Sequence, residues 1–175
     1  MRQLLKLHPD SRCDAVREIA VEAGRIDKAA LRLRYRATGV MVGLRIPQPA
    51  RPARTDALWQ HTCFEAFLRP SGGDAYLEYN FAPSTEWAAY SFASYRSEMR
   101  VIADAAVSVE VELADDTLDV VALIEGLPED AAWQMGVSAV MEEIGGRRSY
   151  WALSHPPGKP DFHHSDCFAL ELPRI

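Results

Sequence analysis

Cysteines, lysines and long apolar runs are scarce in this sequence of 175 residues. The three cysteines, Cys13, Cys63 and Cys167, are odd in number and lack metal-type spacing, so we expect neither a disulfide framework nor a cysteine-bound metal. No apolar run reaches the roughly 18 residues of a membrane helix. The segment Met1–Pro9 has neither the apolar core nor the cleavage site of a signal peptide. We therefore expect a cytoplasmic protein without a membrane partner.

Positive charge is also in the minority. The formal net charge is −6 and the isoelectric point is about 5.4, a balance that argues against a general nucleic-acid partner because phosphate backbones repel acidic proteins. Apolar residues make up 48% of the chain, enough for a sizeable core. The length suits one domain over residues 1–175.

Alternation of apolar and polar residues is the dominant pattern that is present. Leu31, Leu33 and Tyr35 share one face of a segment whose other face carries arginines, as in a half-buried strand. Further strands are predicted at 40–46, 58–69, 75–81, 107–113, 118–124, 133–141, 149–154 and 167–172. A loop is predicted at 47–57, and only 14–23 and 94–106 leave room for short helices. Many short strands joined by turns predict an all-β fold, an antiparallel two-sheet sandwich, and the lack of crossover helices excludes a parallel α/β fold.

The hairpin of 58–69 and 75–81 carries the most informative side chains. One face of both strands is apolar, and pairing these apolar faces places Glu65 opposite or diagonal to Glu78 and Asn80. Trp59 and His61 extend the same polar face. Aromatic rings stack on the apolar face of a sugar while carboxylates and amides bond its hydroxyls, so this mixture favours a sugar site. The alternative interpretation is an ordinary solvated face with ion-paired carboxylates.

Two later segments add candidate ligand contacts. Residues 87–92 are rich in aromatic residues and are predicted as a strand, with Trp87 and Arg96 as functional candidates because a cation would keep nearby carboxylates ionised. A proline-rich, stiff loop then presents His155, Lys159, Asp161 and His163. The histidines do not have a standard metal-ligand spacing, so a metal site is the weaker interpretation of this loop.

Several stretches resemble the DOMON-like proteins, bacterial domains related to the family 9 carbohydrate-binding modules. The resemblance is carried by Arg54–Phe67, Tyr76–Ser84, Trp87–Phe92, Tyr95–Arg96 and Pro160–His163. It implies an immunoglobulin-like or jelly-roll sandwich whose ligand is a sugar or haem. In such carbohydrate modules tryptophans clamp a terminal sugar, a role that would fall to Trp59, Trp87 and Trp151. In haem-binding members a methionine and a histidine are axial ligands, which would be Met99 or Met135 with His155 or His163.

Three functions that involve a small ligand therefore compete, and a pure interaction domain without a small ligand is a further alternative. The first is a non-catalytic binding domain for a small ligand, a sugar or sugar-like metabolite, with no cofactor and no resident metal. The second is haem or metal binding. The third is a glycoside-type hydrolase that uses Glu65 and Glu78, since such enzymes need two carboxyl groups about 5 to 9 Å apart. An open sheet face excludes little water, which disfavours the enzyme.

Overall fold

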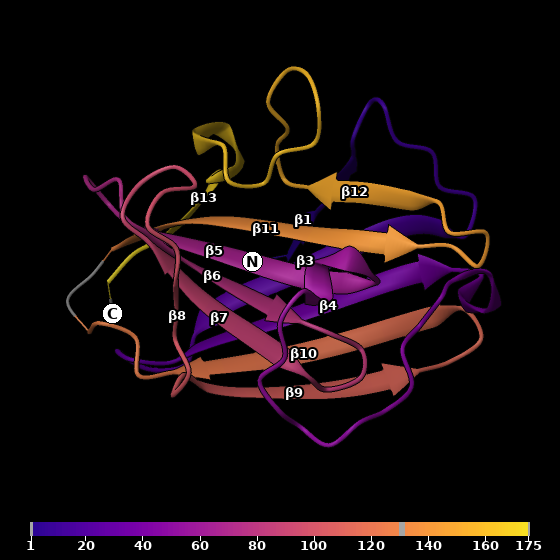
Figure 1. Cartoon of the computed structure of the whole chain (residues 1–175), viewed down its shortest axis with the longest axis horizontal. Coiled ribbons are helices and arrows are strands. Elements are labelled where there is room, and N and C mark those ends of the chain that lie inside the picture. The colour runs from indigo at the N-terminus through magenta and orange to yellow at the C-terminus, as the bar shows by residue number, and fades with distance from the viewer. Residues whose placement is uncertain (1, 130–131, 175) are drawn as a thin grey trace.

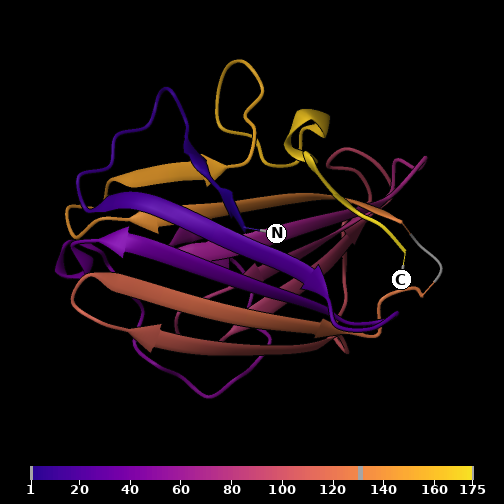
Figure 2. The ribbon, with the colours of Figure 1, turned by 180° about the vertical axis from the view of Figure 1, so that it is seen from behind.

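The computed structural model describes residues 2–129 and 132–174, and they form two antiparallel β-sheets packed face to face (Figures 1 and 2). The predicted all-β sandwich is confirmed. Helix is limited, in these residues, to three short 3-10 segments, and no helix among them is long and apolar enough to cross a membrane.

The first sheet has five strands within the described residues. In spatial order they are β1 (Arg2–Leu4), β3 (Val16–Arg25), β4 (Leu31–Gly39), β10 (Thr117–Glu125) and β9 (Ala106–Leu113). Arg34 and Arg36 of β4 lie on the outer face of the sheet and pair with the carboxylate of Asp119 on β10. This sheet lies in front in Figure 2.

The second sheet carries the predicted polar face. In spatial order its strands are β2 (Lys6–Leu7), β12 (Arg148–Ala152), β11 (Trp133–Glu142), β5 (Cys63–Pro70), β6 (Tyr76–Phe81), β7 (Trp87–Phe92) and β8 (Arg100–Val101), with β13 (Leu170–Leu172) paired to β11. All three predicted hairpins form: β5 with β6, β9 with β10, and β11 with β12.

The main core lies between the sheets. Phe64, Leu68, Tyr79 and Phe81 of the second sheet pack there against side chains of the first, as the alternation predicts. Tyr35 reaches across from β4, and its hydroxyl donates a 2.7 Å hydrogen bond to the backbone carbonyl of Glu65. This bond ties the first sheet to the strand that carries the central carboxyl group.

The outer face of the second sheet is not open to water, contrary to the expectation of a flat exposed face. A second apolar cluster covers part of it, built from Phe67, Tyr76, Tyr90 and Phe92 on the strands and from Phe162 and Phe168 on the long loop after β12. This loop and the 3-10 segment η3 (Ser165–Cys167) rise above β12 and β11 in Figure 1. The loops thereby turn a sheet face into a partly enclosed site.

The prediction of a strand at 40–46 is wrong. The chain leaves the first sheet at Gly39 and turns through η1 (Met41–Gly43). It then joins the second sheet, where the Arg45 amide donates to the Glu142 carbonyl. A Cβ at position 39 would lie 2.0 Å from the carbonyl oxygen of Ala15, so only glycine permits this crossing between the sheets.

Four other predicted elements also need correction, two in their type and two in their length. The helix allowed at 14–23 is instead mostly β3, whose Ile19, Val21 and Ala23 alternate into the core. The helix allowed at 94–106 is turns and β8. The strand at 58–69 begins only at Cys63, because η2 (Leu58–Gln60) precedes it, and the strand at 167–172 is reduced to β13. For 14–23, pairing with the neighbouring strands β1 and β4 overrode local propensity.

Candidate functional site

The polar face centres on three side chains of one ladder. Asn80 lies directly opposite Glu65 on β5, and Glu78 lies opposite Phe67, so the two glutamates are diagonal neighbours. This is one of the two registers that the sequence predicts. The amide Nδ2 of Asn80 donates a 2.8 Å hydrogen bond to Glu78 Oε1, and Ser138 Oγ on β11 lies 3.4 Å from Glu65 Oε2.

Both glutamates are buried, which favours their neutral form. Burial and the nearby Glu78 raise the pKa of Glu65 well above its usual range, although the Ser138 hydroxyl and the charge of Arg96 oppose the rise. Burial also raises the pKa of Glu78, although the Asn80 amide and the charge of Arg96 oppose the rise. The pair therefore holds protons that exposed glutamates would lose.

Hydrogen bonds link Arg96, Tyr76 and His163, and the His163 ring lies beside Glu78. The backbone amide of Arg96 donates to the Tyr76 hydroxyl at 3.1 Å, and that hydroxyl lies 2.7 Å from His163 Nδ1. We assign the hydroxyl proton to this bond, which places the imidazole proton on Nε2, 3.7 Å from Glu78 Oε2. Burial, together with the charge of Arg96, lowers the pKa of His163 to about 4, so the ring is neutral near pH 7.

The Arg96 guanidinium is held by a carboxylate on the long loop. Its Nη2 donates a 2.8 Å hydrogen bond to Asp161 Oδ1, and the Tyr95 hydroxyl donates to Oδ2 of the same group. Although partial burial opposes it, the bonds from Tyr95 and Arg96 lower the pKa of Asp161. The cation that the sequence proposes for the glutamates is thus engaged elsewhere, and Lys159 is exposed.

A cavity of about 600 Å³ opens over these groups. Its lining combines acidic, basic and aromatic side chains: Asp56, Trp59, Glu78, Tyr90, Phe92, Arg96, Met99 and His163, together with Ala57 and Val101. Trp59 and Met99 are 49% and 59% exposed, so their side chains are available to a ligand at the rim.

The rim is braced by an ion pair and by unusual backbone. Asp56 accepts hydrogen bonds from the Arg54 guanidinium and, at 2.6 Å, from the Tyr90 hydroxyl. Ala57 and Arg96 adopt φ of 62° and 51°, a left-handed conformation that costs energy for residues with a Cβ. Such conformations persist only where the surroundings impose them, and here both residues line the cavity.

The tertiary structure separates two of the predicted tryptophans from the site. Trp87 is paired with Phe81 and packs against the core between the sheets, on the opposite face from Glu78. Trp151 is buried in the same core, where its Nε1 donates to Ser149 Oγ at 3.0 Å. A tryptophan clamp built from Trp59, Trp87 and Trp151 is therefore wrong, and only Trp59 lines the cavity.

Two predicted histidines also lie apart from the glutamates. His61 bonds through Nδ1 to Glu142 Oε2 at 2.7 Å, four positions along β11 from Ser138. His155 lies 2.8 Å from the Lys6 carbonyl oxygen through its Nε2 and packs against His8. The candidate ligand contacts therefore gather on the cavity only in part: Glu78, Arg96 and His163 line it, Asn80 and Asp161 bond to lining residues, and Glu65 lies beside Asn80.

Sequence reasoning missed four contributors. Tyr76 has the same strand parity as Glu78 and Asn80, a signal that was available. Tyr90 and Phe92 were not among the candidates, because alternation alone does not say which face of 87–92 turns outward. Asp56 lies within the proline-rich loop at 47–57, where no local pattern marks a ligand contact.

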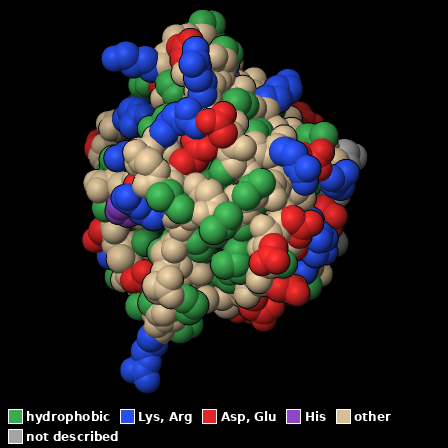
Figure 3. All heavy atoms as spheres, turned by 90° about the vertical axis from the view of Figure 1, so that its right-hand side faces the viewer, with side chains coloured by type: hydrophobic (Ala, Val, Ile, Leu, Met, Phe, Trp, Pro, Cys, Tyr) green, Lys and Arg blue, Asp and Glu red, His purple; other side chains and the backbone are tan. Residues whose placement is uncertain are grey.

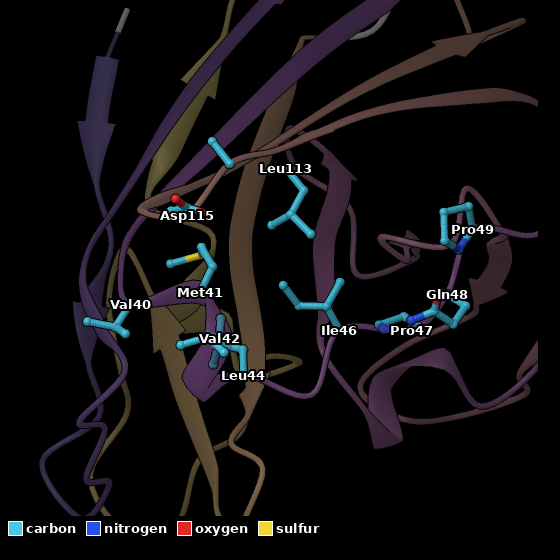
Figure 4. A pocket seen from close by; sticks show the side chains of 11 residues that line it. Val40, Met41, Val42, Leu44, Ile46, Pro47, Gln48, Pro49, Leu113 and Asp115 are labelled. Carbon is cyan, nitrogen blue, oxygen red and sulfur yellow. The ribbon is translucent and has the colours of Figure 1, made fainter.

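A second cavity, of about 730 Å³, lies at the other end of the sandwich and differs in chemistry. Hydrophobic side chains gather on this end of the molecule (Figure 3). Ile46 and Leu113 face one another across the cavity (Figure 4), and Asp115 is the one charged residue among its described lining. It lacks the converging polar groups that orient a polar ligand, so the Glu78 cavity is the stronger candidate.

The residues present do not fit haem. Met135 is fully buried in the main core. Met99 and His163 share the cavity, but His163 Nδ1 is bonded to Tyr76 and its Nε2 faces Glu78. His155 Nε2 lies against a backbone carbonyl, and its buried Nδ1 faces no solvent. In the described residues, no group of three or more histidine, cysteine or acidic side chains is arranged to hold a metal ion.

Comparison with known proteins supports the fold. No protein-family model matches the chain, and none of the curated proteins is significantly similar to it in sequence. Among solved structures, the crystal structure of a candidate carbohydrate-binding protein from Bacteroides uniformis superposes with a TM-score of 0.67 and 13% identity. The match covers 98% of this chain and 85% of that one. At this identity the likeness shows a shared fold alone.

Proposed function

We propose that this protein binds a sugar or sugar-like metabolite, without catalysis, in the cavity that Trp59 and Glu78 line. The observation that carries the proposal is the half-exposed Trp59 ring beside converging Glu78, Arg96 and His163 side chains. A sugar offers an apolar ring face to an aromatic residue and hydroxyls to charged and amide groups, so it matches both parts of this lining. The fold shared with the Bacteroides uniformis protein, named for carbohydrate binding, is consistent with it.

Membership of the DOMON-like group, with its relation to family 9 carbohydrate-binding modules, is part of the same proposal. It rests on the stretches Arg54–Phe67 and Tyr76–Ser84, which supply Asp56, Trp59, Glu65, Glu78 and Asn80. Of these, Asp56, Trp59 and Glu78 line the cavity. The sandwich fold is the one that the resemblance implies.

Binding is favoured over glycoside hydrolysis by the state of the two glutamates. A glycosidase needs one carboxyl group held neutral and another held ionised, and their environments must separate the two pKa values. Here the pKa values of both Glu65 and Glu78 are raised by burial. Glu78 lines the cavity, whereas Glu65 is not among the described residues of its lining. Glycoside hydrolysis by Glu65 and Glu78 therefore stays an untested alternative, and these features of the two glutamates do not favour it.

Titration with a panel of monosaccharides, followed by tryptophan fluorescence and calorimetry, tests the proposal. Trp59→Ala should weaken binding about tenfold or more, because a stacked tryptophan is often among the largest contributors to a binding interface. Trp151→Phe is the matched control, since Trp151 lies in the main core. It should bind normally at temperatures where it remains folded. Equal binding by wild type and Trp59→Ala, or no binding by any sugar, would overturn the proposal.

A further inference from the structure

The charges around the cavity bear on the ligand's own charge. Arg54 pairs with Asp56, and Arg96 pairs with Asp161, so these two cations and two anions cancel. Glu65 and Glu78 remain, and among the described residues no Lys or Arg forms an ion pair with either of them, since the one such contact is that of His163 with Glu78. The cavity therefore has carboxyl groups in excess of its cations.

His163 does not supply the missing charge. Its Nε2 is 3.7 Å from Glu78 Oε2, too far for a hydrogen bond, and its ring is neutral near pH 7 because its pKa is lowered to about 4. Glu78 Oε1 accepts from Asn80, but no hydrogen bond from a described residue reaches Oε2. A polar atom at the cavity wall is thus left for a ligand to satisfy.

We propose that the ligand is an amino sugar bound as its ammonium ion, with the ammonium against Glu78 Oε2. This rests on the proposed sugar-binding function and names the substrate class. The ammonium supplies the cation that the two glutamates lack, and it allows the pair to ionise despite burial. The rings of Trp59, Tyr90 and Phe92 line the same cavity, and aromatic faces attract cations.

Ionisation on binding has a measurable consequence, because the pair gives up a proton as the ammonium arrives. The other titratable groups facing the pair keep their states near neutral pH. Tyr35 on β4, Cys63 on β5, and Tyr76 and Tyr90 have pKa values raised by burial, so they stay neutral. Arg96 and Asp161 stay ionised as a pair, and His163 stays neutral. Proton release therefore reports on Glu65 and Glu78.

Calorimetry with glucosamine, N-acetylglucosamine and glucose, each in two buffers of different ionisation enthalpy near neutral pH, tests the inference on the wild-type protein. Glucosamine should bind at least about tenfold more tightly than the two neutral sugars, with release of up to about one proton per ligand. Glu78→Gln should remove this preference. Glu112→Gln, on an exposed position of β9 in the other sheet, is the matched control and should keep the preference.

The outcomes separate the two proposals. If neutral sugars bind as tightly as glucosamine and no proton is released, the amino-sugar inference is overturned while sugar binding stands. If no sugar binds, the proposed function fails and this inference fails with it. If cyclohexylamine binds as tightly as glucosamine, the site recognises an ammonium alone, and the amino-sugar assignment is likewise overturned.

Discussion

Glu78 lies diagonally across the β5–β6 ladder from Glu65, and the direct partner of Glu65, Asn80, donates its amide to Glu78. This places two carboxyl groups on one buried patch of sheet with a single amide between them. Neutral or shared-proton states follow, because two buried carboxylates that lie close together disfavour joint ionisation. The following predictions test this relationship and its surroundings.

Replacing both glutamates by glutamine should preserve or raise stability. Because the pKa values of Glu65 and Glu78 are raised in the folded state, wild-type stability should fall as pH rises above the range in which free glutamate ionises. The Glu65→Gln, Glu78→Gln variant stays neutral. Its melting temperature should therefore exceed that of wild type at mildly alkaline pH, and the difference should shrink on acidification.

Glu143→Gln is the matched control, and we expect it to change the melting temperature in the opposite direction. Glu143 accepts from the backbone amides of Asp14 and Ala15 and pairs with Arg147, whose hydrogen bond lowers the pKa of Glu143. This variant should melt lower than wild type at neutral pH, and the difference should vanish as pH falls. A glutamine pair that melts below wild type at alkaline pH would show that Glu65 and Glu78 are structural.

Tyr76→Phe should destabilise the protein by about 1–3 kcal/mol, since it leaves His163 Nδ1 and the Arg96 amide without their hydrogen-bond partner. Urea denaturation measures the change. Tyr79→Phe is the control on the same strand, because Tyr79 faces the main core and its hydroxyl makes no hydrogen bond with the described residues. Losses of the same size in both variants would contradict the role assigned to the Tyr76 hydroxyl.

Asp161→Asn should reduce both acid sensitivity and ligand affinity. The pKa of Asp161 is lowered in the folded state, so its contribution is complete above the ordinary aspartate range and is lost as pH falls. The variant should be less stable than wild type at neutral pH and should lose less on acidification. Asp166→Asn, at an exposed position of η3, should change little. If Asp161→Asn and wild type lose stability equally on acidification, the Arg96–Asp161 ion pair does not make the stabilising contribution that we assign to it.

Gly39→Ala should destabilise the fold by about 1–3 kcal/mol or more, because the added Cβ would lie 2.0 Å from the Ala15 carbonyl oxygen and the backbone would have to move. Gly24→Ala, within β3, is the matched control, since no atom lies within 4 Å of its added Cβ. It should be neutral or stabilising by up to about 1 kcal/mol. Thermal melts that rank the two variants in the reverse order would contradict the tight crossing at Gly39.

The sequence by itself determined the all-β class, the three hairpins and two possible registers, both of which bring Glu65 close to Glu78 and Asn80. It could do so because side chains on a strand repeat every two residues, and only one family of registers buries both apolar faces. The same periodicity identified Glu78 and Asn80 as members of the polar face, and the resemblance pointed to Trp59.

Only the tertiary structure decided which face of β7 is buried, and this placed Trp87 in the core and Tyr90 in the cavity. Only it paired Arg96 with Asp161 and His163 with Tyr76, across 65 and 87 positions of sequence respectively. Partners at such separations are chosen by how loops fold over the sheet. Alternation within a strand carries no information on that choice, because it describes local direction and not the path of the chain between strands.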